Sequence, residues 1–393
     1  MNNFKKVFEK IKYNKENLEK GGVNAIPFPF PSWNKVIPGI LPEMQTTLTT
    51  VSGAGKTLVS TGIYIQNPFN FWKQNKDIMD IDVKMFLFCL EDSTELTTKR
   101  FIIRQLWEQL GERLSMFKIN SYFEGDTLDD DTLRKIESLD PYFEEFFSKV
   151  ELCDDVKHPS GIYYKVKSWL ELPENGYIAD EHGNRLNPAQ IKEAKENFKK
   201  TQYIPTVNNR FVIVVLDNMQ NVTSEKGQES KWHALDTLCR TYFREKLCNY
   251  YKCSTLIIAQ QEKSKEKTIY NLDGDIVSGK FKPDLSSIAE YKNVTDSSHL
   301  VLGLFDPYRY GISTFPEGKN FYNISRLESY YRNLHILKSN FAEVNTNISL
   351  LFDGMSGTIS ELPKTGSIEM DQVYEYVDEL IANKKGIKKL KMK

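Results

Sequence analysis

Four short runs of apolar and β-branched residues have the pattern expected of strands that are covered on both faces of a parallel sheet. The runs span residues 46–51, 84–90, 210–216 and 254–259. Helical segments are predicted between them, where apolar residues recur at intervals of three and four. This alternation predicts an α/β fold, in which helices on both faces cover a mostly parallel central sheet.

Three further segments complete the expected framework. Apolar residues at helical spacing predict an amphipathic helix over residues 3–20, ended by Gly21-Gly22. The apolar stripe of this helix must be buried either against its own domain or against a neighbouring subunit. Residues 26–45 contain five prolines, so no long regular helix is expected there. A helix is predicted over residues 94–114.

Residues 115–205 form the least regular part of the chain and are rich in acidic pairs and aromatic residues. We interpret residues 171–207 as an insertion on the surface of the domain. The elements predicted in this part are a strand at 146–152, a helix at 161–170, a hairpin at 177–186 around His182-Gly183-Asn184, and a polar helix at 189–200.

A glycine-rich loop joins the first strand to the helix that follows it, with the sequence Thr-Val-Ser-Gly-Ala-Gly-Lys-Thr over residues 50–57. This order matches a phosphate-binding loop, GxxxxGK[ST], except that Thr50 stands where the pattern has glycine. Small residues let the backbone N–H groups turn inward around a phosphate chain, and the following helix points its positive end at the anion. The alternative is a glycine-rich turn that ends in Lys-Thr by chance. The residues predicted to bind the nucleotide here are Thr50, Ser52, Gly53, Ala54, Gly55, Lys56 and Thr57.

Each of the four strands delivers a polar residue at its carboxyl end: first Lys56, then Glu91, Asp217 and Gln261. Ligands of open parallel sheets bind at that edge, so these side chains should converge on one crevice. Lysine supplies a cation for the phosphates, while Asp217 and the hydroxyl of Thr57 can hold Mg²⁺. As an alternative, Glu91 and Asp217 could be ordinary strand-terminating acids or helix N-caps.

Composition narrows the class of protein. The 393 residues include 52 basic and 53 acidic side chains, so no global field attracts nucleic acid, and any such affinity must come from local patches. Five cysteines without a CxxC pair and five scattered histidines argue against a disulfide framework or a zinc site and favour reduced, packed thiols. No apolar run is long enough to cross a bilayer, and no signal-type core follows Met1. We therefore expect a cytoplasmic protein without a membrane partner.

The order and spacing of these motifs resemble the RecA-fold ATPase domain of DnaB-type replicative helicases, superfamily 4, over roughly residues 23–362. The segment 89–93, which holds Glu91, is similar to the family's catalytic-glutamate segment. Residues 217–220 resemble its Asp-Tyr-Leu-Gln motif, and residues 260–262 its Ser-Gln-Leu motif, with Gln261 in register. In this family the first glycine of the loop is often replaced. More loosely, residues 282–302 resemble the DNA-facing loop and the next strand, and residues 335–362 the final strand pair.

The resemblance implies a RecA-like P-loop NTPase that hydrolyses ATP with Mg²⁺. Lys56 would hold the phosphates, Glu91 would position or deprotonate the attacking water, and Gln261 would sense the γ-phosphate, so these three are the catalytic candidates. It also implies a homo-hexameric ring with ATP at the subunit interfaces, single-stranded DNA in the channel, and a primase or loader as partner. The family's N-terminal primase-binding domain is expected to be absent, because only a short helix precedes residue 23.

Two features depart from the family. Its trans-acting Lys-x-Arg pair is matched by Lys338 but not by Asn340, so Arg332, or Arg326, is the candidate substitute for the missing arginine. Residues 289–292 lack the family's Arg-x-Ser-Gly in the DNA-facing loop. The candidate DNA-binding residues flank that loop and are Lys263, Lys265, Lys267, Lys280 and Lys282.

These inferences predict three parts: an N-terminal helix and linker at 1–22, the ATPase domain at 23–363, and a C-terminal helix with a basic tail at 364–393, disordered from Asn383. The predicted function is an ATP-dependent DNA helicase motor in the replication of a phage or a related element, in which case the compartment is the host cytoplasm. The alternatives are a RecA- or RadA-like recombination ATPase, and a non-hydrolysing, nucleotide-gated DNA-binding or loading module.

Overall fold

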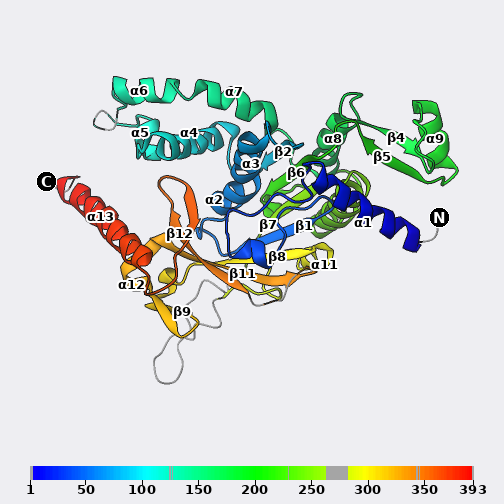
Figure 1. The fold of residues 1–393 in the computed structure, drawn as a ribbon. Helices are drawn as coiled ribbons and strands as arrows, with labels where there is room; N and C mark the ends of the chain where they lie inside the picture. The colour runs from blue at the N-terminus through cyan, green and yellow to red at the C-terminus, as the bar shows by residue number, and fades with distance from the viewer. Residues whose placement is uncertain are drawn as a thin grey trace.

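A nine-stranded sheet organises the protein, in the order β13-β12-β11-β8-β1-β7-β6-β2-β3 (Figure 1). The computed structural model describes residues 3–391 except 124, 126, 229, 263–281, 342–343 and 345. All pairs from β8 to β3 are parallel, whereas β11, β12 and β13 continue the sheet in antiparallel fashion. The strands are β1 (Gln45–Thr50), β2 (Asp82–Cys89), β3 (Val150–Cys153), β6 (Arg210–Asp217), β7 (Ser254–Gln260), β8 (Leu300–Phe305), β11 (Tyr331–Ser339), β12 (Asn347–Asp353) and β13 (Thr358–Glu361).

Helices cover both faces of this sheet, and two small hairpin-like sheets lie outside it: β4 (Gly176–Asp180) with β5 (Thr201–Pro205), and β9 (Thr314–Glu317) with β10 (Asn320–Asn323). Helix α2 runs on through Gly62–Gln66 into α3, and α10 runs on through Thr237–Tyr250. The helices are α1 (Asn3–Glu19), α2 (Lys56–Thr61), α3 (Asn67–Asn75), α4 (Thr94–Leu110), α5 (Met116–Ile119), α6 (Asp130–Glu137), α7 (Asp140–Lys149), α8 (Pro159–Leu170), α9 (Pro188–Glu196), α10 (Lys231–Asp236), α11 (Val294–Ser297), α12 (Ile324–Leu327) and α13 (Ile368–Lys391).

The core explains why the central strands are continuous apolar runs. Along β6, Ile213 and Val215 belong to the cluster that packs under α3 and α7, whereas Val214 and Leu216 belong to the cluster under α8 and residues 237–250. Successive side chains of a strand point to opposite faces, so a strand covered on both faces needs apolar residues at every position. The predicted α/β fold with a mostly parallel sheet is confirmed, and all five cysteines are buried free thiols, as expected.

Several predicted elements are confirmed with small shifts in their bounds. The N-terminal helix, the helix at 94–110 and the four central strands are present, and residues 26–45 hold only the short helical turn Trp33–Lys35 before β1 begins at Gln45. Helix α4 ends where Gly111 adopts a left-handed conformation, with φ of 66°. The terminus of α4 thus follows from a residue without a Cβ atom.

Three local predictions were wrong. The expected strand at 146–152 begins only at Val150, because Phe146 and its aromatic neighbours at helical spacing form α7 and pack into the core. The expected hairpin at 177–186 has a single bridge, between Ala179 and Arg185; β4 pairs instead with β5. The tail from Asn383 is helical to Lys391, because α13 is already nucleated at Ile368 and its propagation adds one bond per residue.

The N-terminal helix touches the domain through polar contacts. Lys10 Nζ lies 2.9 Å from Glu43 Oε1, and Asn17 Nδ2 donates to Asn24 Oδ1 at 2.9 Å. Its apolar stripe is exposed, so the expected burial against its own domain does not occur. We call this set the α1 stripe: Phe4, Val7, Phe8, Ile11 and Leu18, each between 44% and 73% exposed.

Candidate active site

The four strand ends that carry the predicted site residues are neighbours in space. Lys56 follows β1, Gln261 follows β7, Asp217 ends β6 and Glu91 follows β2, and these four strands are adjacent in the sheet in that order. They are also parallel to one another, so their carboxyl ends lie at one edge. The structure therefore brings the four predicted residues to the same edge of the sheet.

The loop before α2 has the backbone that its glycines make possible. Gly53 has a φ of 76° and Gly55, the N-cap of α2, a φ of 99°, both in the left-handed region. A Cβ atom on Gly55 would lie 2.5 Å from Cζ of Phe352, so this close approach excludes any larger residue. The two glycines let the chain turn from the end of β1 directly into the first turn of α2.

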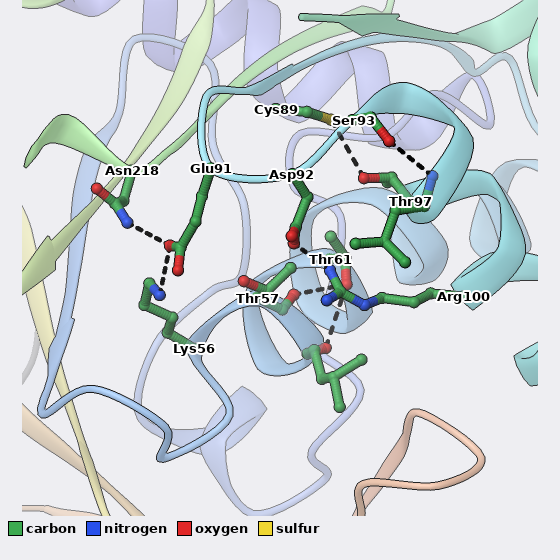
Figure 2. Close-up of polar contacts among 12 residues, drawn as sticks. Lys56, Thr57, Thr61, Cys89, Glu91, Asp92, Ser93, Thr97, Arg100 and Asn218 are labelled. Atoms are coloured by element: carbon green, nitrogen blue, oxygen red, sulfur yellow. Dashed lines mark hydrogen bonds and ion pairs between the residues drawn. The ribbon is translucent and has the colours of Figure 1, made fainter. Parts of the chain in front are cut away.

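Lys56 and Glu91 form an ion pair at the mouth of this loop (Figure 2). Lys56 Nζ lies 2.7 Å from Glu91 Oε2, and the same oxygen accepts a hydrogen bond from Asn218 Nδ2 at 2.5 Å. Lys56 is nearly buried, whereas the Glu91 side chain is 41% exposed. The carboxylate therefore occupies the lysine that a phosphate would bind, and an incoming anion must compete with Glu91 for it.

Neither Glu91 nor Asp217 is a helix cap. The hydroxyl of Ser93 accepts the N–H of Leu96 and caps α4, and the Asn218 side chain caps the turn Met219–Asn221. The alternative explanation of these two acids as N-caps is thereby excluded.

Asp217 is a buried carboxylate with an unsatisfied oxygen. It is 4% exposed, and its Oδ1 atom has no hydrogen-bond partner among the described residues. Burial raises the pKa of Asp217 to about 6, although a hydrogen bond with Thr57 and the charge of Lys56 act in the opposite direction. A buried carboxylate oxygen beside a threonine hydroxyl is the donor set that a hard divalent cation prefers, so these residues fit Mg²⁺.

We expect Asp217→Asn to stabilise the metal-free and nucleotide-free protein. The folded-state pKa near 6 exceeds the ordinary value of 3.8, so the cost of burying the charge develops as the pH rises from 3.8 and is complete above 6. Two pKa units correspond to about 3 kcal/mol at neutral pH. Chemical unfolding from pH 5 to pH 8 should therefore show a gain that grows with pH. Asp155→Asn, at an exposed aspartate, is the control, and a pH-independent gain would contradict the assignment.

Gln261 links the loop strand to the segment that resembles a DNA-facing loop. Its Nε2 donates to Thr49 Oγ1 at 2.8 Å and to the Asp284 carbonyl at 3.1 Å, and its N–H donates to the Thr50 carbonyl at 2.9 Å. Its Oε1 is buried without a partner in the described part of the chain. Gln261 is thus in contact with both segments that a phosphate sensor would have to connect.

The predicted trans-acting residues lie in different places. Arg332 is 4% exposed and is bound within its own chain, to Asp306 and to the Ala54 carbonyl, which does not fit a role in trans. Arg326 pairs with Asp378 on α13. Lys338 lies at the opposite end of β11, where its Nζ donates to the Thr295 carbonyl at 2.6 Å. A role for Lys338 in a neighbouring site stays a prediction.

Four of the candidate DNA-binding lysines, Lys263, Lys265, Lys267 and Lys280, fall outside the described residues. The fifth, Lys282, is described, and its Nζ lies 5.4 Å from the centroid of the Phe315 ring. In the described part of the chain, no helix is both long enough and apolar enough to span a membrane.

Sequence reasoning missed four polar residues near the loop. Asn218 holds Glu91, and its position directly after Asp217 was a usable signal. Arg100 on α4 pairs with Asp92 beside Thr57 (Figure 2), two positions that helical spacing from Glu91 could have suggested. Arg309 donates to the Ser52 carbonyl across 257 positions of sequence, a separation at which no local pattern gives a signal.

Comparison with solved structures identifies the fold. The chain matches the solved ATPase domain of a DnaB-like helicase with a TM-score of 0.58 and 15% identity, over 91% of this chain and 99% of that one. It matches a second protein, a DnaB-like replicative helicase solved in a study of its interactions with primase, with a TM-score of 0.56 and 15% identity, over 92% of this chain and 66% of that one.

The chain has the fold of the DnaB-like helicase ATPase domain. The resemblance inferred from the motifs is therefore confirmed at the level of the fold. No protein-family model matches the chain, and no curated protein is similar enough in sequence to match. The chain spans about two thirds of the length of the DnaB-like replicative helicase.

Proposed function

We propose that the protein is an ATP-driven DNA motor of the DnaB type, which hydrolyses ATP with Mg²⁺ and moves on single-stranded DNA. The observation that carries the proposal is the edge formed by four adjacent parallel strands. There the Lys56–Glu91 pair, the unsatisfied Asp217 oxygen and Gln261 follow a glycine-rich loop in a DnaB-like ATPase fold. The parts at 1–22, 23–363 and 364–393, with the surface insertion at 171–207, belong to the same proposal.

The chain's own residues supply the steps of this reaction. Phosphate binding moves Lys56 from Glu91 to the β- and γ-phosphates, so the carboxylate becomes free to accept a proton from water. Asn218 keeps that carboxylate oriented. Thr57 and Asp217 would hold Mg²⁺, which neutralises charge on the phosphates when bound. Gln261 passes the state of the site to the segment near Asp284.

The direct test is ATP hydrolysis with and without a single-stranded oligonucleotide of mixed sequence. We expect turnover that the DNA increases, because the DNA-facing segment and the site share Gln261. Strand displacement on a forked duplex then tests the motor itself. ATP binding without turnover, at high protein concentration and with DNA present, would contradict the proposal.

One observation favours a second candidate, a non-hydrolysing, nucleotide-gated DNA-binding or loading module. Asn340 stands where the family has a trans-acting arginine, and Arg332 is bound within its own chain. An arginine finger contributes about 10³ to 10⁵ in hydrolysis rate, so its loss leaves an ATPase slow. Nucleotide-dependent DNA binding without turnover is the result that this candidate predicts.

We further propose that copies of the chain assemble head to tail through two exposed apolar surfaces. The first is the α1 stripe. The second, which we call the α5–α6 surface, lies at the other end of the molecule (Figure 1). A contact between unlike surfaces on opposite ends repeats from copy to copy, and it closes into a ring, here proposed to be a hexamer, if the rotation permits. The α5–α6 surface consists of Phe117, Tyr122, Phe123 and Leu133, each between 48% and 64% exposed.

The charges around these two surfaces are complementary. Helix α1 carries five lysines and three glutamates, so it is basic. Beside the α5–α6 surface lie three consecutive exposed acids, Asp129, Asp130 and Asp131. Opposite charges at the rim would steer the two surfaces together and fix their register.

We expect Ile11→Asp to reduce or abolish this assembly, because docking would bury an unpaired carboxylate in an apolar contact. Light scattering coupled to size-exclusion chromatography, with ATP and Mg²⁺ present, measures the mass. Lys20→Gln changes the charge by the same amount at an exposed site off the stripe and is the control. An unchanged mass for Ile11→Asp, or an equal loss in the control, would contradict this interface.

A further inference from the structure

The loop before α2 is tied from its outer side at three alternate residues. The bonded groups are one side-chain hydroxyl and two backbone carbonyls of the loop, and every partner comes from β8, from the turn after it, or from β11. The three bonds run from Thr50 Oγ1 to the Leu304 carbonyl at 2.7 Å, from the Arg309 guanidinium to the Ser52 carbonyl, and from Arg332 Nε to the Ala54 carbonyl at 2.7 Å.

Asp306, which directly follows β8, connects the two arginines. Its Oδ2 lies 3.0 Å from Arg332 Nη2, and its Oδ1 accepts the backbone N–H of Arg309 at 3.4 Å. Arg332 also donates to the carbonyls of Ser329 and Tyr331. Asp306 and Arg332 are 7% and 4% exposed, so this is a buried ion pair whose guanidinium donors are used.

These contacts lie on the side of the loop away from the catalytic candidates. Strand β1 has β8 on one side, and on the other side β7, followed by β6 and β2, which carry Gln261, Asp217 and Glu91. In a phosphate-binding loop the backbone N–H groups point at the anion and the carbonyls point away from it. Holding two carbonyls from behind therefore fixes the direction of the N–H groups in front.

The same contacts account for the departure of the loop from the GxxxxGK[ST] pattern. A glycine at position 50 would have no hydroxyl to donate to the Leu304 carbonyl, so Thr50 gives this loop a bond that the usual residue lacks. A buried ion pair such as Asp306–Arg332 is costly to desolvate and adds little net stability. It does, however, hold a group in a defined geometry, and here that group is the loop.

We propose that Thr50, Asp306, Arg309 and Arg332 form a loop brace, a set of positioning residues that keeps the phosphate loop in its anion-binding shape before the nucleotide arrives. The proposal rests on the proposed function for the identity of that anion. A loop ordered in advance loses less conformational entropy on binding, so the brace raises affinity for the nucleotide without touching it. Arg332 then acts in cis, on its own loop.

The test uses two variants that spare the buried ion pair. Arg309→Ala removes an exposed guanidinium, and Thr50→Val removes only a hydroxyl from a buried side chain of the same shape. We expect each to weaken binding of Mg-ATP about 3- to 10-fold, the effect of one lost hydrogen bond. Amide exchange in residues 51–55 should become faster in the nucleotide-free protein, and the melting temperature should change little. Arg309→Lys, which retains a donor, should recover part of the affinity.

The controls separate the brace from general effects and from the proposed function. Arg185→Ala removes an exposed arginine far from the loop and should bind Mg-ATP as the wild type does. Wild-type affinity in both brace variants, with unchanged amide exchange, would overturn the proposal. So would a loss of affinity that follows a lowered melting temperature without rescue by Arg309→Lys. If the wild type itself binds no nucleotide, the proposed function fails, and the brace fails as a nucleotide device with it.

Discussion

Replacing Glu91 with glutamine should lower the rate of ATP hydrolysis about 10²- to 10⁴-fold while ATP still binds. Glutamine keeps the shape of the side chain and an oxygen for the hydrogen bond from Asn218, but it cannot accept a proton from water. Loss of the carboxylate also removes the partner that holds Lys56 at 2.7 Å. ATP affinity should therefore stay the same or increase, since the phosphates no longer compete with Glu91.

Two measurements on the same preparations check this expectation: single-turnover hydrolysis, and the equilibrium affinity for Mg-ATP. Glu95→Gln makes the same chemical change at an exposed position of α4, where the glutamate pairs with Lys99, and should leave both quantities unchanged. Hydrolysis at the wild-type rate in Glu91→Gln would mean that another group activates the water. Weaker binding would mean that Glu91 supports the loop rather than competing for its lysine.

The sequence was most informative where burial is complete. A strand covered on both faces must be apolar throughout, so 84–90, 210–216 and 254–259 were recognisable without any partner in view. Parallel order follows because helices connect such strands, and the edge that collects the site residues follows from the parallel order. Lys56, Glu91 and Asp217 were therefore predictable from the positions of strand ends alone.

Local patterns failed where a contact distant in sequence decides the structure. Phe146 fits a strand and a helix equally well by composition, and only its packing against Phe69 and Phe101 selects the helix. Strand β4 could pair with the residues just after the turn or with β5 beyond α9, and pattern alone does not distinguish them. Short apolar runs are ambiguous in this way until their neighbours are known.

The same limit applies to the arginines of the site. Arg332 was a candidate for a trans role because it opens the strand that carries Lys338, yet its burial depends on Asp306 and Phe352, which sequence spacing does not show. Arg309 carries no motif at all. An arginine in an ATPase of this fold can serve a neighbour's site or its own loop, and only burial and partners separate the two roles.

Lys56→Ala should weaken Mg-ATP binding about 10- to 100-fold, the effect of losing a charge-assisted hydrogen bond, and should remove measurable hydrolysis. The loss exceeds one contact, because Lys56 is the cation between two carboxylates. Without it Glu91 has no ion-pair partner among the described residues, and the lysine no longer opposes the raised pKa of Asp217. Both acids then face the incoming phosphates uncompensated.

A double variant tests this explanation. If repulsion by Glu91 contributes to the loss, Lys56→Ala combined with Glu91→Gln should bind Mg-ATP more tightly than Lys56→Ala alone, although neither hydrolyses it. Lys73→Ala, which breaks an ion pair with Glu145 on α7, is the matched control and should bind as the wild type does. Equal affinities for the single and double variants would show that Lys56 acts on the phosphates alone, and that its pairing with Glu91 has no part in nucleotide binding.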